Sequence, residues 1–169
     1  MGSEKLSGVS VDQMENLVEN MMWFWGNLYQ RWRAAAEDEY GVDAALKLEL
    51  KFIGSIGKSH ARGIKSILNV PKGIAGFIEA YRFAPENFVE GFRISEQTDK
   101  YVVVYNPSCS VQKARTDRGK REFPCKESGI LYFTAFAREI DPDIRLSCIV
   151  CPPDDHPDDC FCKWKIEVV

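Results

Sequence analysis

The sequence lacks several features that would assign it to a class of protein at once. No apolar run reaches the length of a membrane-spanning helix, because arginine or lysine interrupts each candidate. The N-terminus has no basic segment followed by an apolar stretch, so we expect no secretory signal and a cytoplasmic protein. The formal net charge is only -3, which gives no reason to expect nucleic acid or an acidic membrane as a partner.

A nucleotide-binding loop is also missing. Gly57-Lys58-Ser59 resembles the end of a phosphate-binding loop, but the position of that motif's leading glycine is Phe52. The segment moreover lies within a helical pattern and not after a strand. Both observations exclude this kind of nucleotide site.

What the chain does contain is typical of a soluble globular protein. Of its 169 residues, 45% are hydrophobic and 28% are charged. Helical spacing of apolar residues predicts helices over residues 11–39, 43–68, 74–81 and 127–140. An alternating pattern predicts a strand over 88–94, and further strands are expected over 101–105, 144–150 and 163–169.

This order of elements predicts an α+β fold. We expect the N-terminal helices to pack on one face of an antiparallel sheet of about four strands, with one inserted helix. A helical region, 1–84, would precede an α+β region rich in cysteine, 85–169, within one compact domain.

The first predicted helix, capped by Ser10 or Asp12 and ended by Gly41, is apolar on nearly every side. It carries the aromatic residues Trp23, Trp25, Tyr29 and Trp32. Such a helix is buried on both sides or meets a partner. Three interpretations remain open: a core helix, an aromatic pocket for a small ligand, or the seam of a homodimer.

His60 lies on the apolar stripe of the second predicted helix. It is either a hydrogen-bonded core residue or a group that faces a pocket. Several glycines interrupt the same helix, which predicts close packing or a break near Gly57.

All six cysteines lie in the second half, at the ends of predicted elements: Cys109, Cys125, Cys148, Cys151, Cys160 and Cys162. In a reducing compartment, metal ligands or reactive thiols are favoured over disulfides. If the last two strands pair, the sulfurs at 148, 151, 160 and 162 meet at one end of the sheet. The spacing Cys148-x-x-Cys151 suits a zinc knuckle, and His156 could replace one thiolate. An iron–sulfur cluster is the weaker alternative.

Cys125 directly precedes a predicted helix, whose positive end would lower the pKa of its thiol. It is therefore a candidate nucleophile, with His60 or His156 as the base, and otherwise a packing residue or a metal ligand.

Between these elements lies a predicted basic loop, residues 111–122. Arg115, Arg118 or Arg121 could bind a carboxylate or phosphate, although a solvated charged loop explains the same residues. No aromatic residues are interleaved with the cations, which argues against nucleic acid.

Several segments together resemble an uncharacterised family of small bacterial and archaeal proteins. They are Trp23-Phe-Trp25-Gly-Asn-Leu-Tyr29-Gln-Arg-Trp32, Phe83-Ala-Pro-Glu-Asn-Phe-Val-Glu-Gly91, Phe123-Pro-Cys125-Lys-Glu and Cys151-Pro-Pro-Asp-Asp-His156-Pro-Asp-Asp-Cys160-Phe-Cys162-Lys-Trp164. The order of the later cysteines is more distantly similar to two groups, the L-2-amino-thiazoline-4-carboxylate hydrolase-like family and the 4-vinyl reductase-type small-molecule-binding domain. On this resemblance Cys109, Cys125 and Cys162 match the recurring cysteines, while Cys148 and Cys151 are additional.

Three functional hypotheses follow. The first is a cysteine-thiolate metal-binding domain, with zinc as the expected metal, that binds a small apolar or carboxylated molecule. The second, implied by the resemblance, is a hydrolase acting on a cyclic C–N bond through Cys125 or a metal-bound water. The third is a structural homodimer in which a metal only links the strand ends.

Overall fold

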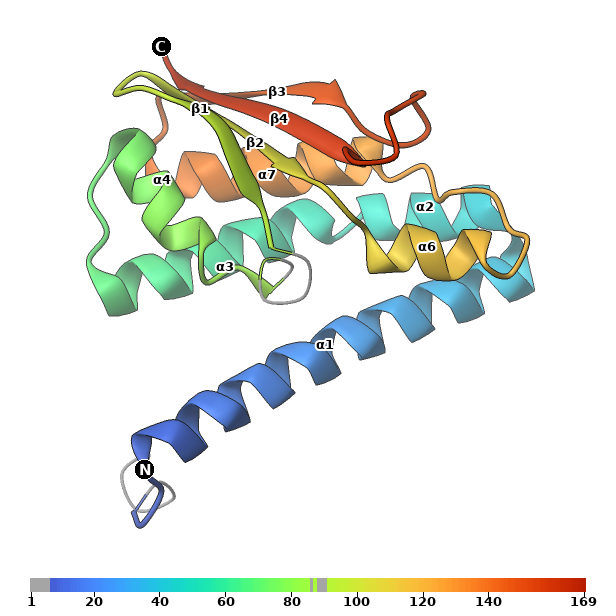
Figure 1. Ribbon diagram of the computed structural model, residues 1–169, viewed down its shortest axis with the longest axis horizontal. Coiled ribbons are helices and arrows are strands. Elements are labelled where there is room, and N and C mark those ends of the chain that lie inside the picture. The colour runs from blue at the N-terminus through green and yellow to red at the C-terminus, as the bar shows by residue number, and fades with distance from the viewer. Residues whose placement is uncertain (1–6, 86, 88–90) are drawn as a thin grey trace.

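The computed structural model describes residues 7–85, 87 and 91–169, and it confirms the α+β fold (Figure 1). Four helices come first: α1 (Val11–Tyr40), α2 (Val42–Leu50), α3 (Ile53–Leu68) and α4 (Gly73–Tyr81). The second half contains β1 (Arg93–Gln97), β2 (Tyr101–Asn106), α6 (Ser110–Thr116), α7 (Lys126–Ile140), β3 (Ile144–Val150) and β4 (Cys162–Val168). None of the described helices is both long enough and apolar enough to span a membrane.

The four strands form one antiparallel sheet in the order β1-β2-β4-β3. The predicted pairing of the last two strands is therefore confirmed, with Cys148 opposite Trp164. On the other side of β4, Cys162 lies opposite Asn106 at the end of β2. This register brings Cys162 to the end of the sheet that the loop after β3 also reaches.

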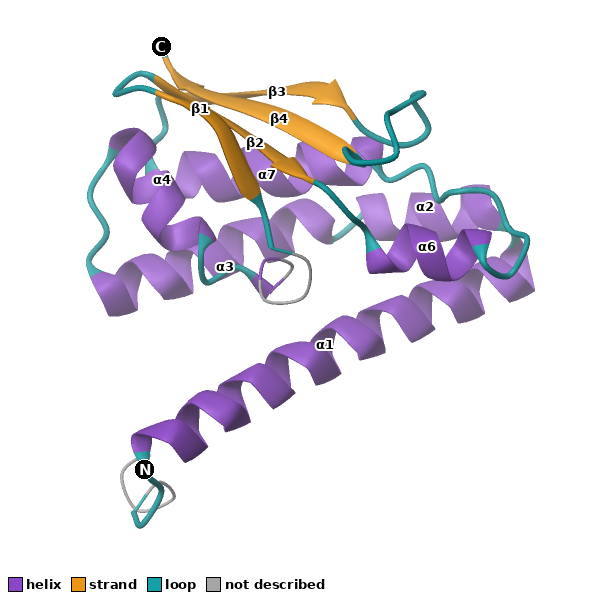
Figure 2. Ribbon diagram, in the orientation of Figure 1, coloured by secondary structure: helices purple, strands orange, loops and turns teal. Residues whose placement is uncertain are grey.

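The helices all lie on one side of the sheet (Figure 2). Helix α7 packs directly against β3, and α3 packs on α7 from behind. The core includes Phe77 and Ile74 from the first half together with Phe136 and Ile166 from the second. The division at residue 84 stays a prediction, but these buried side chains of the two regions pack in one cluster.

The single helix predicted over 43–68 is wrong, because the chain breaks between α2 and α3 at Lys51 and Phe52. At this break the Phe52 ring packs edge to face on Trp32 of α1, with 5.6 Å between the ring centroids. The predicted close packing near Gly57 is confirmed, since a Cβ there would collide with the backbone of Tyr132 in α7. Gly57 itself does not interrupt α3.

Two further predictions need correction. The basic segment predicted as a loop over 111–122 begins with α6, whose residue Gln112 is buried. The strand predicted from residue 88 begins at Arg93, and residues 88–90 lie outside the described part of the chain. Every residue of β1 is exposed, as befits a strand at the edge of the sheet.

The predicted bounds of α1 are confirmed to within one residue. Ser10 and Gln13 form a capping box at its start, and Gly41 ends it with a φ of 84°. Only Arg33 and Ala36 of the thirty residues are buried. The core-helix interpretation of α1 is therefore wrong for the described chain, because most of its apolar side chains are exposed.

Candidate thiol site

Cys125 occupies the N-cap position of α7. Phe123, two residues before Cys125, is fully buried, and the side chain of Gln112 in α6 forms hydrogen bonds with both its N–H and its carbonyl. The Gln112 amide donates to the Phe123 carbonyl at 2.9 Å and accepts from the Phe123 N–H at 2.8 Å. The same amide nitrogen lies 3.5 Å from Sγ of Cys125. Helix α6 thus fixes the thiol at the start of α7.

Cys151 lies directly after β3 and is buried. Its N–H donates to Asp154, whose own N–H returns a bond to the Cys151 carbonyl at 2.9 Å. Lys126, the first residue of α7, then joins this turn to the helix through its N–H to Pro152 and its ammonium to Asp154 at 2.7 Å. As a result, Sγ of Cys151 lies 3.7 Å from Sγ of Cys125.

Cys162 brings a third sulfur to the same place. Its Sγ lies 3.5 Å from the side-chain oxygen of Asn106, and its thiol interacts with that of Cys151. Trp164, two residues later on β4, packs against α7 at Gly129, where a Cβ would lie 2.8 Å from the indole. Three elements that are distant in sequence therefore place Cys125, Cys151 and Cys162 together.

The three thiols differ in acidity. Hydrogen bonding with Cys151 lowers the pKa of Cys125, and the nearby Arg33 cation and Gln112 amide act in the same direction. Hydrogen bonding with Cys151 also lowers the pKa of Cys162. The pKa of Cys151 is raised, because its proton is shared with these two neighbours and because it is buried. As the pH rises, the thiols of Cys125 and Cys162 therefore ionise before that of Cys151, which lies between them in the hydrogen-bond chain.

The Trp164 indole also lowers the pKa of Cys162. The buried indole N–H of Trp164 forms no hydrogen bond that meets the usual distance and angle limits among the described residues. An N–H beside a sulfur stabilises the thiolate form, as hydrogen-bond donors around metal-bound thiolates do.

Buried charges lie beside Cys125. Arg33 of α1 lies over the Phe123 ring at 4.1 Å and within 4.0 Å of Glu49 in α2. Tyr29 donates a hydrogen bond to the other oxygen of Glu49, and burial together with this carboxylate raises the pKa of the phenol. Oε2 of Glu49 has no hydrogen-bond partner among the described residues. Sequence reasoning missed Arg33 and Glu49. Arg33 follows Tyr29 by four residues and Glu49 follows Ala45 by four, and this spacing, which places each on the inner face of its helix, was the available signal.

The remaining cysteines lie around this cluster. Cys148 is close enough for its pKa to respond to Cys125 and Cys162, but burial is the larger effect and raises it to about 11. Sγ of Cys160 is 4.0 Å from the Cys162 carbonyl. Cys109 caps α6. No disulfide joins the cysteines that the structure describes.

The predicted ligand His156 is engaged elsewhere. Its Nε2 lies 3.0 Å from Glu122, its Nδ1 lies 3.0 Å from the Pro157 carbonyl, and its ring leans on Phe161. Burial lowers the pKa of His156, but the Pro157 carbonyl and the Glu122 carboxylate outweigh burial and raise it.

A metal site is not preformed in this arrangement. Within residues 7–85, 87 and 91–169, no three or more histidine, cysteine, aspartate or glutamate side chains are placed so as to hold a metal ion. Of the predicted group Cys148, Cys151, Cys160 and Cys162, the structure brings Cys151 and Cys162 together and adds Cys125 to them.

The predicted aromatic pocket is brought together in part. Trp25 stacks on Tyr29 at 5.8 Å and meets His60 edge to face at 5.4 Å. His60 also shares a hydrogen bond of 3.1 Å with the Tyr132 hydroxyl, and burial lowers its pKa. Trp32 packs on Phe52 instead, and Trp23 is 61% exposed. No hydrogen bond among the described residues joins His60 or His156 to Cys125.

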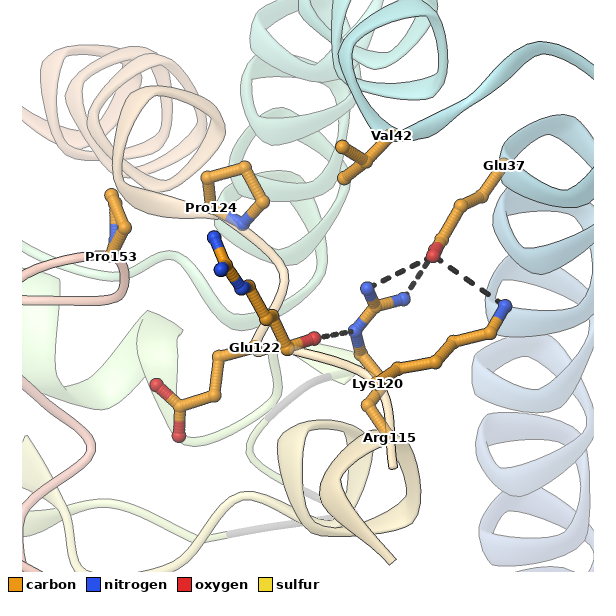
Figure 3. A pocket seen from close by; sticks show the side chains of 8 residues that line it. Glu37, Val42, Arg115, Lys120, Glu122, Pro124 and Pro153 are labelled. Atoms are coloured by element: carbon orange, nitrogen blue, oxygen red, sulfur yellow. Dashed lines mark hydrogen bonds and ion pairs between the residues drawn. The ribbon is translucent and has the colours of Figure 1, made fainter. Parts of the chain in front are cut away.

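An open cleft of about 370 Å³ lies between α1, α6 and the segment that precedes α7 (Figure 3). Pro124 and Pro153, neighbours of the cluster in sequence, form part of its wall. The predicted anion handle Arg115 is already bound, since its guanidinium forms an ion pair with Glu37 and its Nε donates to the Arg121 carbonyl at 3.0 Å. Arg118 is exposed and does not line the cleft. Arg121 does line it, and its side chain has no ion-pair partner in the described part of the chain.

The model of a family of unknown function (DUF6125) matches residues 7–168. No curated protein and no solved structure matches the chain.

Proposed function

The chain belongs to the DUF6125 family of unknown function, and we propose that it is a thiolate metal-binding protein whose ligands are Cys125, Cys151 and Cys162. The observation that carries the proposal is the 3.7 Å between the sulfurs of Cys125 and Cys151. Two thiolates on one tetrahedral zinc ion, each at about 2.3 Å, lie about 3.8 Å apart. Since the described residues hold no preformed metal site, metal binding would require these side chains to turn their sulfurs toward one ion.

The acidity of the cluster supports the same proposal. The lowered pKa values of Cys125 and Cys162 supply two thiolates readily, and a cation bound between the sulfurs would displace the proton of Cys151. Three cysteine ligands suit zinc, and soft sulfur donors exclude the harder magnesium and calcium ions.

A cobalt titration tests the ligand set. We expect the reduced protein, kept free of oxygen, to bind about one cobalt ion per chain and to develop the sulfur-to-metal absorption of a thiolate site. Replacing Cys125, Cys151 or Cys162 with serine should abolish that absorption. Cys109→Ser and Cys160→Ser serve as matched controls and should retain it. Loss in the controls, or retention in the three cluster variants, would refute the proposal.

Cys148→Ser answers a narrower question. Cys148 lies near the cluster, so it is the candidate for a fourth sulfur. If the spectrum and affinity of this variant equal those of the wild type, the site has three sulfurs and an open position. A large loss of affinity indicates a closed four-sulfur site, which is typical of a structural metal.

We propose further that the cleft between α1 and α6 binds a small carboxylated molecule. Arg121 lines the cleft and forms no ion pair with a carboxylate among the described residues, so it replaces Arg115 as the anion handle. Thermal unfolding with a panel of small carboxylates tests this: Arg121→Gln should remove any stabilisation, and Arg118→Gln should not.

A hydrolase acting on a cyclic C–N bond is the second candidate. Its support is the lowered pKa of Cys125, as a nucleophile requires, which results first from the hydrogen bond with Cys151 and then from the buried Arg33 cation. The metal proposal is favoured because no histidine is hydrogen-bonded to Cys125 in the described chain. Stoichiometric, Cys125-specific reaction with iodoacetamide in metal-free protein, blocked by a small cyclic carboxylate, would favour the hydrolase instead.

A further inference from the structure

Helix α1 carries a continuous apolar stripe that the rest of the structure leaves exposed. Its members and their exposed fractions are Leu17 (50%), Met21 (64%), Phe24 (61%), Leu28 (58%) and Trp32 (43%). They are separated by four, three, four and four residues, which keeps them on one face of the helix. The first four follow the spacing of a coiled-coil seam.

The side of α1 that meets the body is a different one. Arg33 and Ala36 are its buried residues, and Tyr29 reaches Glu49 of α2 from the same side. Toward its N-terminus α1 diverges from the other helices (Figure 1). The apolar stripe is therefore turned outward. Of its five members, Trp32 at one end packs on Phe52 with part of its ring, and the other four are each at least half exposed.

The area of the stripe matches what a stable dimer needs. Aromatic side chains bury about 150–250 Å² each when fully covered, leucine and methionine bury somewhat less, and these five are roughly half exposed. The stripe therefore offers about 500 Å² per copy and about 1,000 Å² for a pair, which reaches the lower limit for a specific interface.

We infer that α1 pairs with α1 of a second copy of this chain in antiparallel orientation. A two-fold axis crossing between Phe24 and Trp25 places Leu17 opposite the larger Trp32 and Met21 opposite Leu28, which is of similar size. A parallel pair would instead oppose Trp32 to Trp32 and align the two helix dipoles. This inference is independent of the metal proposal.

Sedimentation velocity of the full chain at micromolar concentrations tests it. The wild type should sediment as a dimer. Met21→Glu combined with Leu28→Glu should give a monomer with unchanged helical circular dichroism, because two carboxylates then meet across the seam. Trp23→Glu is the matched control, since Trp23 is equally exposed but lies on another face of α1, and it should remain dimeric.

A second variant tests the orientation. Met21→Glu combined with Leu28→Lys places opposite charges across an antiparallel seam and like charges across a parallel one. We expect this variant to dimerise more strongly than the double glutamate variant. A monomeric wild type, or a dimer that the double glutamate variant leaves intact, would overturn the inference and show that another partner, or none, covers the stripe. Equal weakness of the two double variants would overturn the antiparallel pairing.

Discussion

The thiol site and the outer face of α1 contrast in how composition relates to burial. The thiol site is built largely from loops that contain proline and aspartate, yet Cys151 and Phe123 are buried and tied by hydrogen bonds to α6 and α7. Helix α1 is rich in tryptophan, phenylalanine and leucine, yet its outer face is exposed. Apolar composition alone therefore does not indicate which residues are buried, and a loop rich in polar residues can be buried and held by hydrogen bonds.

The largest expected effect comes from the same substitution made in both regions. Phe123→Ala removes a fully buried ring and should lower the free energy of unfolding by about 3–5 kcal/mol. Phe24→Ala removes a ring that is mostly exposed, and in the monomer it should change stability by less than about 0.5 kcal/mol. Urea unfolding at low protein concentration measures both. Similar losses for the two variants would contradict the contrast.

A somewhat smaller effect is expected where the two regions meet, at Arg33. Arg33→Met leaves Glu49 buried without its cation, which should cost about 3 kcal/mol of stability. The substitution should also raise the pKa of Cys125, because the Arg33 cation helps to lower it. Arg31→Met, on the exposed side of the same helix, is the control for urea unfolding and for the pH dependence of Cys125 alkylation. An unchanged thiol pKa in Arg33→Met would show that Arg33 does not act on the site.

Smaller, opposite effects of pH are expected at the two histidines. Burial lowers the pKa of His60 below 6.5 in the folded protein. As the pH drops through 6.5, His60 therefore takes up a proton in the unfolded chain before it does so in the folded one, and the free energy of unfolding falls. The pKa of His156 is raised above 6.5, so its contribution is complete below 6.5 and is lost as the pH rises through the raised value.

Variants separate these two slopes. His60→Gln should flatten the stability profile on the acidic side, and His156→Gln should flatten it on the neutral side. Urea unfolding from pH 5 to pH 8 gives the profiles. The same change of slope in both variants would contradict the assigned environments.

Much of the fold was predictable because its signals are local. Ser10 and Gly41 mark the ends of α1, a continuous run of valine and tyrosine marks β2, and alternating residues mark β3 and β4. The break at Phe52 was not predictable, since no proline or glycine stands there, and Phe52 instead packs on Trp32 and on the hydrophobic core. Helix α6 was missed because its one buried residue, Gln112, is polar.

The candidate site was predictable only as a set of residue types. The late cysteines pointed to thiol chemistry at the end of the sheet, and Cys162 and Cys151 do meet there. That Cys125 joins them, and that Cys160 does not, depends on how α6 and α7 pack against the strands. No local spacing carries that long-range arrangement.

X-ray absorption at the zinc edge of the zinc-loaded, reduced protein tests the central claim most directly. The proposed site predicts at least three sulfur neighbours at about 2.3 Å from the metal, and fewer in Cys151→Ser. A shell of nitrogen and oxygen neighbours alone, at about 2.0–2.1 Å, would contradict a metal site built on Cys125, Cys151 and Cys162.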